Sequence, residues 1–223
     1  MMNPTKKLFI VACEASGDSH ASRLIEALRR LDPALQFHGL GGPKMKQAGL
    51  NPLYDMTKIS ALGLGDVLRL YFLYRDIFYD SLSVLTQIKP DALILVDSPA
   101  FNLRFAKKVR NQFPDIPIFY YICPQIWAWG AQRIRTVKKN ITKMYSILPF
   151  EAAFYQKAGM DCEFVGHPLL DEEMDNAWNQ DEARNYLQLP RDSKIIGLLP
   201  GSRKSEIQRI LPIMIKTADL MHA

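Results

Sequence analysis

The sequence has 223 residues, of which 48% are hydrophobic and 23% charged, and its formal net charge is +5. This composition is ordinary for a globular protein and excludes a disordered chain. No apolar run reaches the roughly 18 to 20 residues that span a bilayer, and residues 8–13 are too short for a signal-peptide core. Cys13, Cys123 and Cys162 form no Cys-x-x-Cys pair, so we expect neither disulfides nor a metal site, and a cytoplasmic location.

The first predicted unit is a buried strand at residues 8–13, a loop from Glu14 to Asp18, and a helix whose apolar spacing begins at Ser22. Backbone amides near Ser16 could approach an anionic or sugar ligand closely. Glu14 and Asp18 could accept hydrogen bonds from hydroxyl groups. Turn formation and helix capping would explain the same residues.

A second short strand is predicted at residues 36–40, followed by Gly39-Leu-Gly-Gly-Pro43. Lys44 stands where a dinucleotide-binding motif has its third glycine, and the strand is not the first of the chain. We therefore expect no dinucleotide site here.

Residues 58–89 are predicted as a long helix, and its part at residues 58–80 has more apolar and aromatic side chains than one buried face can hide. Either this helix is buried nearly all round, or part of it contacts a membrane. Tyr71, Phe72 and Tyr74 beside basic residues would suit the interfacial region of a bilayer.

Residues 92–96 form an apolar run without polar alternation, which predicts a strand buried on both faces of a parallel sheet. Asp97 follows at the carboxyl end of this strand, where ligands of open α/β sheets bind, so it could be catalytic. Pro99 keeps Ser98 out of helical geometry, and a helix is predicted to about Gln112. Asp97 could equally be only the cap of that helix.

Two tryptophans, Trp127 and Trp129, lie in a loop beyond the next buried strand, at residues 118–123. They could contact a sugar face or an acyl chain, or they could pack under the basic helix predicted at residues 132–139. Strands at 143–148 and 162–166, with a helix at 149–159 between them, continue the α/β alternation.

The charges are distributed unevenly. Residues 101–145 hold nine basic side chains against one acid, Asp115, whereas residues 161–182 hold eight acids and no Lys or Arg. The basic block could bind anionic lipid, a phosphorylated substrate or nucleic acid, or could simply be solvated helix faces.

After the acidic segment, a strand at residues 193–199, the loop Pro200-Gly-Ser-Arg203 and a helix begin a further unit. A strand, such a loop and a helix N-terminus together favour an anion site, in which Arg203 would supply a fork of donors. One strand and one helix cannot bury a sheet, so we expect this unit to be incomplete.

Eight short motifs occur in a telling order and spacing: Cys-Glu-Ala-Ser-Gly-Asp18, Gly-Leu-Gly-Gly-Pro-Lys-Met45, Gly-Leu-Gly-Asp-Val-Leu68, Asp-Ser-Pro-Ala-Phe-Asn102, Pro-Gln-Ile-Trp-Ala-Trp129, Leu-Pro-Phe-Glu151, Phe-Val-Gly-His-Pro-Leu169 and Leu-Leu-Pro-Gly-Ser-Arg203. Together they resemble the motifs of the lipid-A-disaccharide synthase family over essentially the whole chain.

This resemblance implies an inverting glycosyltransferase of the GT-B type, with two Rossmann-like domains, each a doubly wound parallel sheet. Its reaction would join UDP-2,3-diacylglucosamine to 2,3-diacylglucosamine 1-phosphate, giving lipid A disaccharide 1-phosphate and UDP, without a metal or other cofactor. It also implies a cytoplasmic protein that is peripheral on the inner membrane, contact with the anionic membrane surface, no nucleic acid partner, and a homodimer in the full-length form.

The expected domains are an acceptor-side Rossmann-like domain at residues 1–168, an acidic linker at 169–190 and the incomplete start of a nucleotide-sugar domain at 191–223. By the same resemblance, Asp97 is the catalytic base. Residues expected to bind substrate are Glu14, Ser16, Asp18, Asn102, Gln125, Trp127, Gly201, Ser202 and Arg203. Residues expected to contact membrane or acyl chains are Leu68, Leu70, Tyr71, Phe72 and Tyr74.

The sequence departs from the family pattern at three positions: Cys13 replaces the usual Gly, Ala100 a common Asp, and Gly130 the Arg after the second Trp. Family members are much longer, so we expect weak or no activity from these 223 residues alone. Two other interpretations stay open. One is another GT-B enzyme, such as a polyprenyl-linked sugar transferase or a UDP-sugar epimerase, and the other is a non-catalytic fragment that binds lipid or anions.

Overall fold

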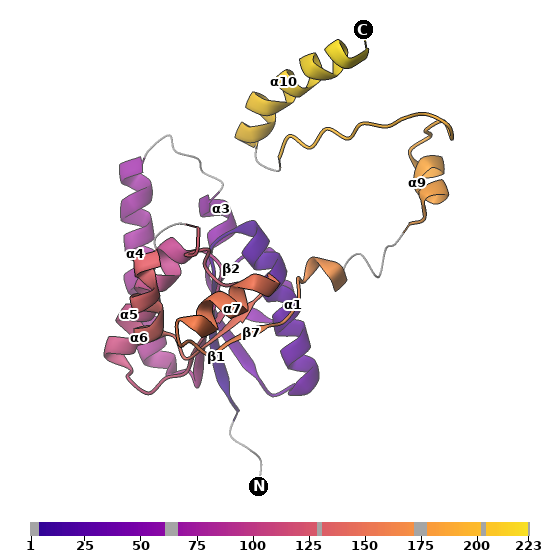
Figure 1. The fold of residues 1–223 in the computed structure, drawn as a ribbon. Helices are drawn as coiled ribbons and strands as arrows, with labels where there is room; N and C mark the ends of the chain where they lie inside the picture. The colour runs from indigo at the N-terminus through magenta and orange to yellow at the C-terminus, as the bar shows by residue number, and fades with distance from the viewer. Residues whose placement is uncertain (1–4, 61–66, 129–130, 172–177, 202–203, 223) are drawn as a thin grey trace. The chain divides into compact units, whose positions relative to one another are not determined.

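The computed structural model describes residues 5–60, 67–128, 131–171, 178–201 and 204–222 (Figure 1). The chain divides into two compact units, Met1–Glu172 and Glu173–Ala223. The first unit carries the sheet and both hydrophobic cores, and the second unit is described separately below.

The first unit is built on a seven-stranded sheet in which every neighbouring pair of strands is parallel. The strand order across the sheet is β3-β2-β1-β4-β5-β6-β7. The strands are β1 (Lys7–Ala12), β2 (Gln36–Gly41), β3 (Leu50–Asp55), β4 (Ala92–Val96), β5 (Ile118–Tyr121), β6 (Lys143–Ser146) and β7 (Cys162–Phe164).

Helices connect the strands and cover both faces of the sheet, which confirms the predicted α/β class and the doubly wound parallel sheet (Figure 1). The helices are α1 (Ala15–Leu31), α2 (Pro43–Ala48), α3 (Met56–Ser60), α4 (Val67–Ile88), α5 (Pro99–Gln112), the short 3-10 helix η1 (Ala131–Arg133), α6 (Ile134–Asn140) and α7 (Pro149–Lys157).

Two hydrophobic cores lie on the two faces of the sheet. Side chains of α1 and α2, such as Ile25 and Met45, pack on one face. Side chains of α4 to α7, such as Leu85, Phe105 and Tyr155, pack on the other. All five residues of β4 are buried, as its uninterrupted apolar sequence predicts for a strand covered on both sides.

The order of the strands fixes where a ligand can bind. From β1 the chain adds β2 and then β3 on one side, and it then crosses back to place β4 on the other side of β1. The direction of winding therefore reverses between β1 and β4. In open α/β sheets such a switch point, at the carboxyl ends of the strands, is where ligands bind.

Close contact between β1 and β2 depends on a glycine. Gly39 has a φ of 142° and lies opposite Ile10 in the register of the two strands. A Cβ atom at this position would lie 1.9 Å from the carbonyl oxygen of Ile10, so no other residue fits here.

The loop predicted from Glu14 to Asp18 is wrong, because α1 begins at Ala15. Ser, Gly and Asp are weak helix formers, yet in the first turn of α1 the small residues allow a close approach to the sheet. A Cβ atom added to Gly17 would lie 3.4 Å from the Cβ of Ala12, which leaves little room for anything larger.

Two further elements, α2 and β3, were not predicted. Pro52 interrupts the strand pattern of β3, but β3 is an edge strand, where a missing backbone N–H is tolerated. Of the helix predicted at residues 58–89, the structure describes the parts in α3 and α4, and residues 61–66 lie outside the described part. The strands predicted at 143–148 and 162–166 are shorter, ending at Ser146 and Phe164.

In the second unit, the structure describes α9 (Gln180–Tyr186) and α10 (Lys204–His222). The strand predicted at residues 193–199 is wrong, because these residues form no strand. A strand requires a neighbour for its backbone hydrogen bonds, and no strand is described elsewhere in this unit. Not one of the described residues from 178 to 222 is buried.

Candidate active site

Two acidic residues follow the two strands at the switch point. Glu14 follows β1 and is the N-cap residue of α1, and Asp97 follows β4 directly. The strands pair in register, with Ala12 opposite Val96, so the two acids extend from the same edge of the sheet. The helices α1 and α5 also begin at this edge, and their positive N-terminal ends favour anions.

Asp97 lies in an unusual backbone turn. Its φ is 48°, and Ser98 follows with a φ of 46° and a ψ of 59°, so both residues are left-handed. This conformation is uncommon for residues other than glycine, and Asp is among the residues that tolerate it best. The N-cap residue of α5 is Ser98, without a side-chain capping bond, so the structure does not support the alternative that Asp97 caps this helix.

Three hydrogen bonds hold the backbone of Asp97. Its amide donates to the carbonyl of Tyr121 at 3.1 Å. Its carbonyl oxygen accepts from Asn102 Nδ2 at 2.7 Å and from Tyr120 Oη at 2.6 Å. The turn is therefore fixed by side chains from α5 and from β5.

The environment of Asp97 suits a proton acceptor. Burial raises the pKa of its carboxyl group, a hydrogen bond from the Ser98 amide partly opposes this, and the negative charge of Glu14 raises it further. A general base is most effective when its pKa approaches the working pH, so this shift is in the useful direction.

The thiol and phenol groups near Asp97 are neutral at neutral pH. Burial, followed by the charge of Glu14, raises the pKa of the Cys13 thiol to about 12, so it is protonated at neutral pH. Burial also raises the pKa values of Tyr120 and of Tyr74, and Tyr74 in α4 senses both Cys13 and Glu14. These thiol and phenol groups therefore add no negative charge beside Glu14 and Asp97 at neutral pH.

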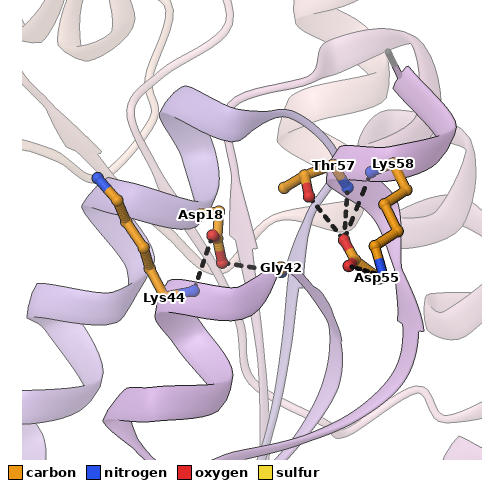
Figure 2. Close-up of polar contacts among 6 residues, drawn as sticks. All are labelled: Asp18, Gly42, Lys44, Asp55, Thr57 and Lys58. Atoms are coloured by element: carbon orange, nitrogen blue, oxygen red, sulfur yellow. Dashed lines mark hydrogen bonds and ion pairs between the residues drawn. The ribbon is translucent and has the colours of Figure 1, made fainter. Parts of the chain in front are cut away.

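Asp18 has a structural role. Its side chain is only 2% exposed, and its two oxygens accept hydrogen bonds from the amides of Gly42 (2.8 Å) and Lys44 (3.1 Å) (Figure 2). The amide of Met45 also donates to it, at 3.0 Å. Asp18 on α1 therefore caps the N-terminus of α2. These amides come from residues 24 to 27 positions away in sequence, and binding of substrate by Asp18 stays a prediction.

The same edge carries a second, more exposed cap. Asp55 ends β3, and its Oδ1 accepts from the Thr57 amide at 3.2 Å and from the Thr57 hydroxyl at 2.6 Å (Figure 2). Lys58 Nζ lies 3.4 Å from Asp55 Oδ2. These contacts hold the first turn of α3, so Asp55 acts as its cap. Glu14 and Asp97 are the acids that follow the two strands of the switch point.

Asn102 also has a structural role. It is fully buried, and its Nδ2 donates to the carbonyls of Val96 (3.1 Å) and Asp97 (2.7 Å). No surface of this side chain is exposed in the structure, and binding of substrate by Asn102 stays a prediction. Asn102 supports the Asp97 turn. Ser16, by contrast, is exposed on the first turn of α1.

The loop after β5 is held by α7. Trp127 Nε1 donates to Glu151 Oε1 at 3.1 Å, and the Trp127 ring meets the Phe150 ring edge to face, with centroids 4.9 Å apart. Trp127 keeps 38% of its surface exposed, and Gln125 is exposed too. Trp127 therefore packs on α7 rather than under the basic helix α6. Trp129 lies outside the described residues.

Two residues of this edge were not predicted. Tyr120 Oη binds the Asp97 carbonyl, and Glu151, which is 2% exposed, binds the indole of Trp127. The sequence does single out both residues, since Tyr120 carries a polar group within a buried strand and Glu151 is the last residue of a family-like motif. Neither signal identifies the partner.

Residues predicted on the second unit are described only in part. Gly201 is exposed and has a φ of 109°, and α10 begins at Lys204. Ser202 and Arg203 lie outside the described residues.

The aromatic helix α4 is partly buried and partly exposed. Ile77 and Leu85 belong to the core, whereas Tyr71 and Phe72 are 60% and 48% exposed. Arg75 lies over the Phe72 ring at 5.0 Å. Leu70 and Tyr74 are half-buried, and the side chain of Leu68 lies outside the described part. The helix is therefore not buried all round, and contact of its exposed side chains with a membrane stays a prediction.

Within the described ranges, no helix combines the length and apolarity needed to cross a membrane. Over the same residues, no three or more His, Cys, Asp or Glu side chains gather where they could hold a metal ion.

Comparison with solved structures supports the fold class. UDP-GlcNAc 2-epimerase from Neisseria meningitidis, bound to UDP-GlcNAc, superposes with a TM-score of 0.51 at 10% sequence identity, covering 84% of this chain and 54% of that chain. The fold is therefore a Rossmann-like α/β architecture, which this chain shares with the epimerase. The family model described as lipid-A-disaccharide synthetase matches residues 8–223, and the chain belongs to that family.

Curated relatives agree. Lipid-A-disaccharide synthase 1 of Legionella pneumophila (strain Paris) is 43% identical over 220 residues, which are 99% of this chain and 57% of the relative. Lipid-A-disaccharide synthase of Trichlorobacter lovleyi is 40% identical, covering 97% of this chain and 56% of the relative. The chain thus spans little more than half the length of these relatives.

Proposed function

We propose that this chain contributes the catalytic base to a lipid A disaccharide glycosyltransferase. Its substrates would be UDP-2,3-diacylglucosamine and 2,3-diacylglucosamine 1-phosphate. The observation that carries the proposal is the position of Asp97, in a left-handed turn at the switch point, with burial raising the pKa of its carboxyl group.

In this reaction the Asp97 carboxylate accepts the proton of the acceptor sugar's hydroxyl group as that oxygen attacks the anomeric carbon of the donor. The bond from that carbon to the UDP oxygen breaks on the opposite face, so the configuration inverts, and UDP leaves with the electron pair. Glu14 and Ser16, at the start of α1, would bind hydroxyl groups of the sugars. Charge on the departing UDP requires cationic or amide donors, the role we assign to Gly201, Ser202 and Arg203.

Acyl chains would contact the apolar side chains near the same edge. Trp127 is part exposed with its indole N–H already bound to Glu151, so it offers a ring surface rather than a hydrogen bond. Together with Gln125 it is our candidate for the sugar or acyl contact.

Membrane binding would involve α4 to α6. Tyr71 and Phe72 are exposed on α4 beside Arg75, and α5 and α6 carry exposed basic side chains without exposed acids. Leu68, Leu70 and Tyr74 would complete the apolar contact. Such a surface suits a protein that is peripheral on the cytoplasmic side of an anionic inner membrane. A homodimer of the full-length form belongs to the same proposal, and nucleic acid is not among the partners.

The decisive test is Asp97→Asn in the enzyme with its complete natural chain, measured by UDP release from the diacylated donor in the presence of acceptor. We expect a loss of about a hundredfold or more, the range for removing a general base. Asp115→Asn, at an exposed turn, is the matched control and should keep wild-type turnover. Wild-type turnover in Asp97→Asn would overturn the assignment.

Substrate arms in the same assay separate the alternatives. Transfer to a polyprenyl acceptor, or conversion of a UDP-sugar into its epimer, would favour another GT-B enzyme. Binding to anionic vesicles without UDP release from any donor would favour a non-catalytic module.

A further inference from the structure

The carbonyl oxygen of Asp97 is bound from two sides by buried side chains. Tyr120 reaches it from β5 at 2.6 Å, and Asn102 reaches it from α5 at 2.7 Å. Both residues have 0% exposed surface. The carbonyl of an ordinary connecting turn can be satisfied by water. This carbonyl is instead bound by two side chains from different elements.

The turn that these bonds hold is strained. Asp97 and Ser98 are both left-handed, and Ile122, at the end of the neighbouring β5, has a φ of 61°. Left-handed geometry is unfavourable for residues with a Cβ, particularly a β-branched one, and it persists only where the surroundings impose it. Strained residues of this kind cluster at functional sites.

The bonds also determine where the carboxylate lies. The Asp97 carbonyl belongs to the peptide plane between Asp97 and Ser98, so fixing that oxygen fixes the plane and the direction of the Asp97 side chain. Asn102 Nδ2 additionally donates to the Val96 carbonyl at 3.1 Å, which ties the turn to the last residue of β4. Without these donors the turn could relax to the common backbone regions, which would move the carboxylate.

We propose that Tyr120 and Asn102 are positioning residues for Asp97, whose hydrogen bonds to its carbonyl hold the left-handed turn and keep the carboxylate at the switch point. This inference rests on the proposed function, in which Asp97 is the base. Both residues are fully buried, so in this role they act on Asp97 through its backbone.

The chain offers a matched pair of tyrosines for the test. Tyr155 and Tyr120 are both fully buried, and each donates a hydrogen bond from its hydroxyl group to a backbone carbonyl. The acceptor of Tyr155 is the carbonyl of Pro124, which follows β5. Tyr120→Phe and Tyr155→Phe therefore remove the same kind of bond, but only the first touches Asp97. The first readout is the pKa of the Asp97 carboxyl group in this chain, followed by NMR with 13C-labelled aspartate.

We expect Tyr120→Phe to lower the pKa of Asp97 toward that of an exposed aspartate, because a relaxed turn admits water to the carboxylate. Tyr155→Phe should leave it at the wild-type value. In the enzyme with its complete natural chain, Tyr120→Phe should lower kcat by about tenfold to a hundredfold with KM changed less than about twofold, as expected for a misplaced catalytic group. In Tyr155→Phe, any loss should be confined to KM.

A second matched pair keeps the test valid if Tyr120→Phe does not fold. Asn102→Leu removes the two hydrogen bonds that Asn102 donates, to the carbonyls of Val96 and Asp97. Asn140→Leu is its control, since Asn140 is 2% exposed and donates to the Thr136 carbonyl in α6. Equal pKa values of Asp97 and equal kcat in the test and control variants would overturn the inference. Wild-type turnover in Asp97→Asn would instead overturn the proposed function, while a shifted pKa in Tyr120→Phe would still support positioning.

Discussion

The carboxylate of Asp97 is held in a position that is unfavourable for the fold at neutral pH. Its pKa is raised in the native state, mainly by burial, above the ordinary value of about 3.9 in an unfolded chain. Between these two pKa values the native state binds more protons than the unfolded state. Stability therefore falls as the pH rises through this window, and the unfavourable contribution remains at higher pH.

Asp97→Asn should consequently stabilise the protein at pH 7, raising Tm by a few degrees, because it removes a buried charge. At pH 3, where Asp97 is protonated in both states, the two proteins should unfold at nearly the same temperature. Thermal unfolding followed by circular dichroism at both pH values would check this. A lower Tm for Asp97→Asn at pH 7 would mean that the charge stabilises the fold.

The position of Asp97 at the end of a buried strand could be predicted from the sequence, but the residues that hold its backbone could not. An apolar run followed by Asp and a nearby Pro is a local pattern, which can be recognised without knowledge of the rest of the fold. Tyr120 and Asn102 act on a carbonyl 23 and 5 residues away, respectively, through contacts that only the folded sheet creates. The partners of Asp18 could not be predicted for the same reason, since they come from a different helix.

At the level of elements, α2 depends on a residue outside it. The six-residue helix has no side-chain cap of its own, because its N-cap residue is Gly42. Asp18 of α1 takes that role, and a Cβ atom on Gly42 would lie 2.6 Å from Asp18 Oδ2. The short helix and its cap are thus one structural unit made from distant parts of the chain.

Asp18→Ala should therefore act on stability. It leaves the amides of Gly42, Lys44 and Met45 without their acceptor, and we expect the free energy of unfolding to fall by about 3 kcal/mol. Asp18→Asn keeps one acceptor oxygen and should lose less. Urea unfolding measures both, with Asp32→Ala, at the exposed C-terminal end of α1, as the control. A loss below about 1 kcal/mol in Asp18→Ala would contradict the capping role.

Apolar runs show how far a local pattern can predict an element. Residues 92–96 and 193–199 both resemble buried strands in sequence, yet only the first forms one. The difference lies in the neighbours, since β4 has β1 and β5 on either side, whereas the second unit offers no described strand to pair with. Such an element could not be predicted from its own residues, because its hydrogen bonds are made elsewhere.

At the scale of the molecule, both hydrophobic cores are formed by residues 8–162. The predicted alternation of strands and helices was enough to predict the fold class, because the spacing of apolar residues indicated the correct type for most elements. The boundary between the two units falls at Glu172 and Glu173, within the segment predicted as a linker, and α9 occupies part of that segment.

The helices α4, α5 and α6 cover the same face of the sheet and carry the proposed membrane surface. Binding to vesicles that contain anionic lipid should therefore weaken as salt rises, because screening shortens the Debye length from about 30 Å at 0.01 M to about 8 Å at 0.15 M. Reversing two exposed charges on α5, with Lys107→Glu and Lys108→Glu, should reduce binding severalfold in a sedimentation assay.

The control for this experiment lies on the other face. Arg30→Glu and Lys46→Glu make the same change of charge on α1 and α2, where both residues are exposed. If the two double variants lose binding equally, net charge alone explains the effect and the proposed surface is wrong.

The strand order also has a consequence for synthesis on the ribosome. The first strand to emerge, β1, is an inner strand of the finished sheet, and each later strand adds to a free edge: β2 and β3 on one side, then β4, β5, β6 and β7 on the other. No strand has to be inserted between two that are already paired. The sheet can therefore grow outward in the order of translation, so nascent chains should gain protected backbone amides strand by strand.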